Sequence, residues 1–88
     1  MLYVDYVGAH YDTGKPFEST WETGKPFPFI LGAKQIVAGI DQGLKGMKVG
    51  GRREMIVPPE LAYGDHGIPG TVARNETLIY VVDLLAAH

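Results

Sequence analysis

Hydrophobic residues recur with the period of an α-helix in one stretch of the chain, between Gly32 and Gly51. The residues on one helical face, at steps of four, four and three, are Ile36, Ile40, Leu44 and Met47. The glycines inside the stretch are Gly39, Gly43 and Gly46, and each lowers helix stability by roughly 1 kcal/mol relative to alanine. We therefore predict one short helix here, which is stable only when other elements cover its apolar face.

Elsewhere apolar and polar positions alternate, which is the pattern of half-buried β-strands. The stretches predicted as strands are 2–7, 16–19, 27–31, 52–57 and 78–85. The last is the longest and most apolar, so we expect it at the centre of the sheet. The first is expected to end at Gly8, and Phe27, Phe29 and Leu31 are expected to share an inward face. Pro28 cannot donate to a strand ladder, which favours an edge strand or a bulge there.

These elements predict an α+β fold, in which a curled antiparallel sheet of about four strands wraps over one short α-helix. With 88 residues the chain has room for a single domain, 1–88, and one modest core. The loop from Glu60 to Asn75 is long for so small a domain, and such loops are more often functional than idle.

The pentapeptide Thr-Gly-Lys-Pro-Phe occurs twice, at 13–17 and at 23–27. Two copies of five residues are too few and too short for a repeat architecture, which needs at least about three units of ~20 or more residues. We interpret them as two similar turns that lead into strands.

Composition narrows the possible partners. A net charge of −2 and a pI near 5.8 offer no basic patch, so we expect neither nucleic acid nor a membrane surface as a partner. The absence of cysteine excludes disulfides and thiolate chemistry. No segment approaches the ~18 apolar residues of a membrane span, and the start lacks the basic region of an export signal. We expect a cytoplasmic protein, unless such a signal precedes Met1.

Few side chains suggest acid, base or nucleophilic chemistry. Ser19 lies in no nucleophile motif, so a hydroxyl in a turn or strand is the simpler interpretation. The histidines at 10, 66 and 88 lack the spacing of metal ligands, and we expect no metal or other cofactor. Asp5 and Glu18 are expected on solvated faces. What remains is a concave aromatic face, which by itself is more often ordinary core than a site.

Five segments carry a specific combination of motifs: Tyr6 to Phe17, K-P-F-P-F-I-L-G at 25–32, G-M-K-V-G-G-R-R at 46–53, P-P-E-L-A-Y-G at 58–64 and T-L-I-Y-V-V-D-L-L at 77–85. Together they resemble FKBP-type peptidyl-prolyl cis-trans isomerases, in particular short bacterial, actinomycete-like members. The resemblance implies an FKBP-like fold and a rotamase that acts in protein folding. It also implies rotation about Xaa-Pro bonds in an apolar aromatic pocket, without covalent or acid/base chemistry.

The resemblance further implies partners and site residues. The partners would be proline-containing peptides or unfolded protein segments, and macrolides such as tacrolimus or rapamycin, bound by a monomer. The implied catalytic residues are Tyr6, Phe17, Phe27, Val37, Ile40, Tyr63 and Tyr80, and the implied ligand-binding residues are Glu18, Gln35 and Ile36. The Tyr63 hydroxyl and the Val37 N–H would bind carbonyls of the ligand. Glu18 stands where the family usually has aspartate.

Three departures from the family pattern matter. Ile40 replaces the usual tryptophan of the pocket floor, and Trp21 lies elsewhere. Residues 72–75 replace a proline-containing segment and add the charge of Arg74. The family's N-terminal strand is absent, which predicts an unpaired edge on the strand 52–57. These departures leave two alternatives open: an FKBP-like binding or chaperone module with weakened catalysis, and a structural domain whose aromatic residues are all core.

Overall fold

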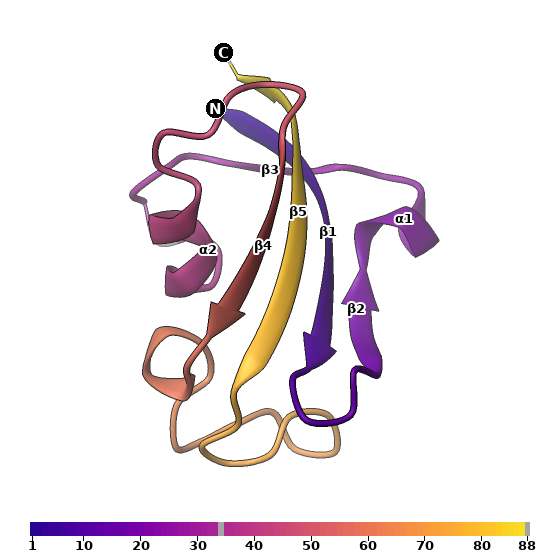
Figure 1. The fold of residues 1–88 in the computed structure, drawn as a ribbon, viewed down its shortest axis with the longest axis vertical. Coiled ribbons are helices and arrows are strands. Elements are labelled where there is room, and N and C mark those ends of the chain that lie inside the picture. Colours follow the sequence, from indigo (N-terminus) through magenta and orange to yellow (C-terminus); the bar gives the residue numbers. More distant parts are fainter. Residues whose placement is uncertain (34, 88) are drawn as a thin grey trace.

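In the computed structural model, which describes residues 1–33 and 35–87, the strand β5 (Leu78–Ala87) runs through the middle of an antiparallel sheet (Figure 1). It pairs with β1 (Leu2–His10) on one side and with β4 (Arg52–Val57) on the other. The strands β2 (Pro16–Ser19) and β3 (Phe27–Phe29) both pair with the outer edge of β1. The predicted α+β fold and the central place of the last strand are confirmed, with five strands instead of about four.

The two short strands occupy different halves of one edge. β3 lies opposite residues 2–4 of β1 and β2 lies opposite residues 7–9. Pro28 therefore sits in an edge strand, as its missing N–H predicts. β3 ends at Phe29, so Leu31, which is predicted to share its inward face, lies in the following turn and is exposed.

β1 continues to His10, whereas the alternation predicts an end at Gly8. Gly8 pairs with Tyr80 of β5, and a Cβ atom on Gly8 would lie 2.7 Å from Tyr80 Cε1. The glycine therefore leaves room for an aromatic ring to lie across the strand, and it does not terminate the strand.

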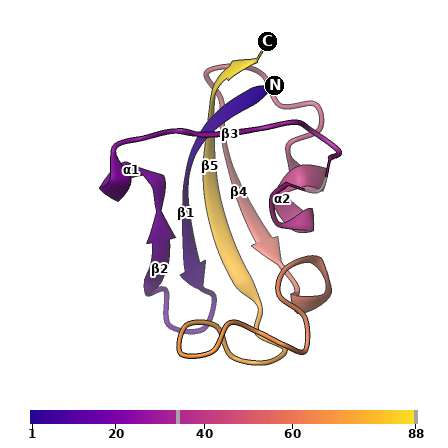
Figure 2. The same ribbon diagram turned by 180° about the vertical axis from the view of Figure 1, so that it is seen from behind.

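The helix α2 (Ala38–Gly43) is much shorter than the helical pattern, whose apolar face extends from Ile36 to Met47. Ile36 precedes it, and Met47 follows it in a turn where Gly46 has a φ of 79°. The buried members of the predicted apolar face are Ile40 and Leu44. Figures 1 and 2 both place α2 beside β4, at the opposite side of the sheet from β2. No helix among the residues that the structure describes is long and apolar enough to cross a membrane.

A second helix, α1 (Thr20–Thr23), follows β2 and is absent from the sequence predictions. The buried Thr20 hydroxyl accepts a hydrogen bond from the Tyr6 N–H at 2.9 Å and donates one to Asp5 Oδ1 at 2.8 Å. Asp5, predicted to face solvent, is half-buried because it accepts this bond. The contact fixes α1 against β1 beside Tyr6.

The two Thr-Gly-Lys-Pro-Phe copies form similar turns at glycine, as predicted, although Thr13 lies in a turn and Thr23 is the last residue of α1. Gly14 and Gly24 have φ angles of 74° and 71°. In each copy the threonine Oγ1 accepts a hydrogen bond from the lysine N–H, at 3.2 Å from Lys15 and at 3.4 Å from Lys25. The chain enters β2 at Pro16, within the first copy, and β3 at Phe27, the last residue of the second. The repeat is therefore a turn that glycine and threonine shape together.

β4 turns Met55 and Val57 toward the core, and Arg52 lies on the opposite face. Arg52 Nε donates to Asp83 Oδ1 on β5 at 2.6 Å. No described strand pairs with the outer edge of β4, as predicted.

The long loop after β4 is ordered by its own hydrogen bonds. It begins with the 3-10 turn η1 (Pro59–Leu61) and is closed where Ile68 bridges to Val72. Val72 is buried in the core, and Arg74 Nε donates to the Asp65 carbonyl at 2.9 Å. The charge of Arg74 is therefore engaged within the loop.

The packing of α2 on β4 predicts that Gly39→Ala lowers the free energy of unfolding. A Cβ on Gly39 would clash with the branched Val57 side chain, while one on Gly43 would meet the flexible Met55 thioether at 2.6 Å. Overpacking costs ~1–3 kcal/mol, which exceeds the ~1 kcal/mol that a helix gains from replacing glycine. Urea denaturation should rank wild type above Gly43→Ala and Gly43→Ala above Gly39→Ala.

The double variant Gly39→Ala/Val57→Ala tests the cause, because removing the Val57 methyl groups also removes the clash. Gly39→Ala should lower the free energy of unfolding less in the Val57→Ala background than in wild type. A Gly39→Ala protein more stable than wild type would contradict this packing.

Candidate functional site

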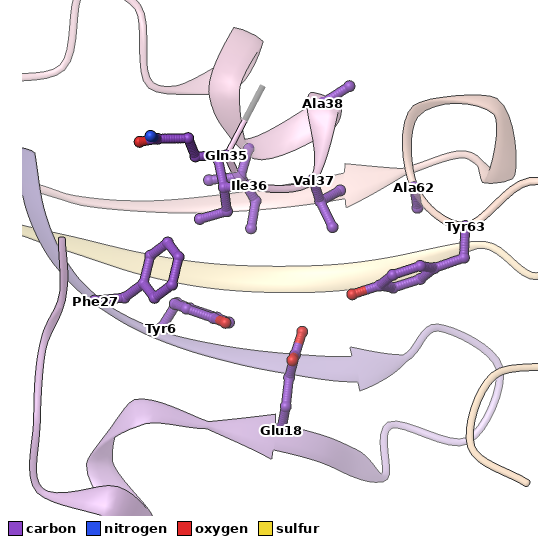
Figure 3. A pocket seen from close by; sticks show the side chains of 10 residues that line it. Tyr6, Glu18, Phe27, Gln35, Ile36, Val37, Ala38, Ala62 and Tyr63 are labelled. Carbon is purple, nitrogen blue, oxygen red and sulfur yellow. The ribbon is translucent and has the colours of Figure 1, made fainter. Parts of the chain in front are cut away.

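Side chains from distant parts of the chain surround a cavity of about 370 Å³ between the sheet and α2 (Figure 3). The lining residues are Tyr6, Glu18, Phe27, Gln35, Ile36, Val37, Ala38, Ile40, Ala62 and Tyr63. All the site residues implied by the resemblance line this cavity except Phe17 and Tyr80. Tyr63 reaches it from the loop after β4, and Phe27 and Val37 line the same space.

Aromatic rings form one end of the cavity. Tyr6 projects from β1, and its ring lies edge-on to Phe27 of β3, with the centroids 6.2 Å apart and the planes at 90°. The floor is Ile40 of α2, which is fully buried. Trp21 lies in α1 and is not among the lining residues. The described walls therefore combine apolar side chains with the polar groups of Tyr6, Glu18, Gln35 and Tyr63.

Tyr80 and Phe17 lie behind the cavity wall, although the resemblance places them on it. Tyr80 is fully buried, with its ring centroid 6.0 Å from that of Tyr6 and 6.2 Å from that of Phe17. Its hydroxyl donates to Glu18 Oε1 at 3.0 Å. Tyr80 projects from the central strand opposite Gly8, so neighbouring side chains cover its ring. It fixes the residues that line the cavity and does not line it itself.

Two hydrogen-bond donors border the cavity. The Val37 N–H lies at the start of α2 and donates to no acceptor among the described residues. Figure 3 shows the Tyr63 hydroxyl directed into the cavity, toward Tyr6 and Glu18. The loop holds Tyr63 in place because the N–H of Gly64 donates to the Pro59 carbonyl at 2.7 Å.

Gln35 has a structural contact that the sequence does not reveal. Its Oε1 accepts a hydrogen bond from the Ile30 N–H at 2.7 Å, which fastens the connection between β3 and α2. In Figure 3 its amide points away from Tyr63 and Glu18. Sequence reasoning missed Ala38 and Ala62 as lining residues, and only the place of Ala62 next to Tyr63 could have suggested it.

Glu18 is the one carboxylate among the described lining residues, and no described cation joins it there. Burial raises its pKa, and the hydrogen bond from Tyr80 offsets this only in part. Burial, followed by the Glu18 charge, raises the pKa of Tyr6 to about 12 and raises the pKa values of Tyr63 and Tyr80. The three hydroxyls are therefore protonated at neutral pH and can donate hydrogen bonds.

No nucleophile with an adjacent base lines this cavity among the described residues. The described residues also contain no group of three His, Cys, Asp or Glu side chains that could hold a metal ion. The arrangement can enclose an apolar group, hold carbonyl oxygens and exclude water.

Three comparisons with known proteins indicate the same family. A sequence model of the family described as "FKBP-type peptidyl-prolyl cis-trans isomerase" matches residues 1–85. An "FK506-binding protein" of Streptomyces anulatus is 55% identical over 84 residues, which cover 94% of this chain and 68% of that protein. A "Probable FK506-binding protein" of Corynebacterium glutamicum is 43% identical over 84 residues, covering 96% and 69%. The crystal structure of AtFKBP13 superimposes with a TM-score of 0.90 at 32% identity, covering 99% of this chain and 78% of that one.

The raised pKa of Glu18 predicts a pH-dependent effect of Glu18→Gln on stability. The folded state keeps the Glu18 proton to higher pH than the unfolded state, whose pKa is near the ordinary 4.5. Wild type therefore loses stability as pH rises from about this value through the folded-state pKa, and the variant lacks this loss. Urea denaturation should show the stability of Glu18→Gln rising relative to wild type across this window and levelling off above it.

Glu54→Gln is the matched control, because it removes one carboxylate at an exposed position of β4. Comparison with it separates the effect of burial from the effect of net charge. If the Glu18→Gln difference were constant with pH, or fell as pH rises, burial would not govern this carboxylate.

Proposed function

Because the chain belongs to the FKBP-type peptidyl-prolyl cis-trans isomerase family and is a peptidyl-prolyl isomerase, we propose that the Xaa-Pro bond turns in the cavity between Phe27, Ile40 and Tyr63. The observation that carries this proposal is a convergence of side chains: the rings of Tyr6 and Phe27 and the apolar residues of α2 meet the Tyr63 hydroxyl and the Val37 N–H at one open cavity.

The physical task is to lower the barrier to amide rotation. Amide resonance sets a barrier of ~18–20 kcal/mol, and an unassisted Xaa-Pro bond takes tens to hundreds of seconds to turn. Twisting removes the resonance and part of the charge separation of the amide. A site that excludes water and offers little polarity therefore favours the twisted form over the planar form.

Each lining group has a part in this rotation. Tyr6, Phe27 and Ile40 surround the prolyl ring and keep water from the amide. The Tyr63 hydroxyl and the Val37 N–H hold substrate carbonyls, which fixes the chain on either side of the bond that turns. Tyr80 acts through Tyr6 and Glu18, because its ring is covered. No proton has to move.

The same cavity binds macrolides of the tacrolimus and rapamycin class, in competition with proline-containing peptides or unfolded protein segments. Relatives named for binding FK506, which is tacrolimus, support this. We also propose that the active form is a monomer.

A weakened binding module is a second candidate, and Ile40 is the observation that favours it. An isoleucine floor offers less flat surface to a prolyl ring than the tryptophan that is usual in the family. This candidate predicts macrolide binding with only weak turnover of proline-containing peptides. Ile40→Trp should raise macrolide affinity if the floor limits binding, and unchanged affinity would dismiss the explanation.

The proposal predicts that the protein accelerates cis-trans isomerisation of a short peptide with an apolar residue before proline, and that rapamycin abolishes the acceleration. Tyr63→Phe should lower kcat/KM roughly two- to tenfold, the range expected for one net hydrogen bond. A protease-coupled isomerisation assay measures both effects.

Tyr11→Phe is the control, because it removes an equivalent hydroxyl from an exposed ring outside the cavity lining. It should retain the wild-type kcat/KM. Full activity in Tyr63→Phe would remove this residue from the mechanism, and folded wild-type protein without rate enhancement would refute the proposed site chemistry.

A further inference from the structure

A second hollow of about 350 Å³ adjoins the cavity on the side of α1. Its lining residues are Tyr6, Glu18, Ser19, Thr20, Thr23, Lys25, Pro26 and Phe27. Tyr6, Glu18 and Phe27 line both spaces, so these three side chains form a shared wall. The proposed rotation uses the first space and leaves the second without a role.

The second hollow differs from the first in its chemistry. Lys25 contributes a cation, and its side chain forms no ion pair or hydrogen bond among the described residues. The Thr20 hydroxyl is already engaged by Tyr6 and Asp5. Glu18 points from the shared wall into the first cavity, between Tyr6 and Tyr63 (Figure 3), and accepts the bond from Tyr80. Lys25 is therefore the cation that lines the second hollow, and it has no ion-pair partner among the described residues.

The position of Lys25 follows from the repeated pentapeptide. The second Thr-Gly-Lys-Pro-Phe copy supplies Thr23, Lys25, Pro26 and Phe27 to the hollow. The first copy has the same turn, yet its lysine, Lys15, lines neither space. The chain thus contains two lysines that follow similar glycine turns, and only Lys25 borders the hollow.

We propose that the second hollow is a subsite for the part of the polypeptide substrate that flanks the Xaa-Pro bond, and that Lys25 selects an acidic side chain there. The inference rests on the proposed function of the adjoining cavity. An extended chain advances ~3.3–3.6 Å per residue. If the proline lies in the first cavity, a residue two or three positions away can therefore reach past the shared wall into the second hollow. A Glu or Asp side chain complements the free ammonium group.

The test uses peptides that share one Xaa-Pro core and carry Glu, Gln or Lys two or three positions from the proline, on either side. At one of these positions wild type should show kcat/KM in the order Glu, Gln, Lys, with Glu about two- to fivefold above Gln, as expected for an exposed charge pair. The preference should shrink at high salt. The readout is the Glu-to-Gln ratio within each protein, so any general change in activity cancels.

Lys25→Gln should bring this ratio close to one, and Lys25→Glu should invert it. Lys15→Gln makes the same change of charge in the matched turn and should keep the wild-type ratio. A wild-type ratio near one at every position, or an equal loss of preference in Lys15→Gln and Lys25→Gln, would overturn the subsite. Absence of turnover with the Gln peptides would instead refute the proposed function itself.

Discussion

The burial of one tyrosine ring between three strands is the contact on which the site depends. Tyr80 projects from the central strand, crosses β1 where Gly8 has no side chain, and donates its hydroxyl to Glu18 on β2. The ring supports Tyr6 from behind, at a centroid distance of 6.0 Å. Because β2 is short and lies at the edge of the sheet, this hydrogen bond and ring contact hold it where its carboxylate borders the cavity.

The other half of the cavity depends on a helix that could not exist alone. α2 has six residues, and two glycines in it face Val57 and Met55 on β4 at very short range. The absence of side chains at these positions brings the helix close to the sheet, which places Val37 and Ile40 at the cavity. Glycines that disfavour a helix locally are therefore needed for the packing that stabilises it.

The sequence predicted those parts of the fold that follow from local pattern. Alternation located β4 at its observed bounds and β5 in the centre, because each buries one face. The turn signal at 12–15 located β2, which follows it. The helical periodicity predicted too long a helix, because the pattern continues to Met47, beyond the turn at Gly46. α1 escaped prediction because a tertiary contact, from Thr20 to Asp5 and Tyr6, fixes it.

The sequence identified most of the residues of the site, but it did not show which of them line the cavity and which lie behind its wall. The resemblance gathered residues from distant parts of the chain, but it could not separate Tyr63, which faces the cavity, from Tyr80, which lies beneath its wall. That difference depends on which neighbours cover each ring. The second hollow was also beyond prediction, because the two pentapeptide copies are identical in sequence and differ only in their surroundings.

The central claim is that the enclosure turns the Xaa-Pro bond by excluding water and holding carbonyls, without transferring a proton. The most direct measurement is kcat/KM for peptide isomerisation in H2O and in D2O at matched acidity. The account predicts that kcat/KM in H2O divided by kcat/KM in D2O is close to one, since no proton is transferred when the amide twists. A clear slowing in D2O would show that a proton moves in the rate-limiting step and would contradict the account.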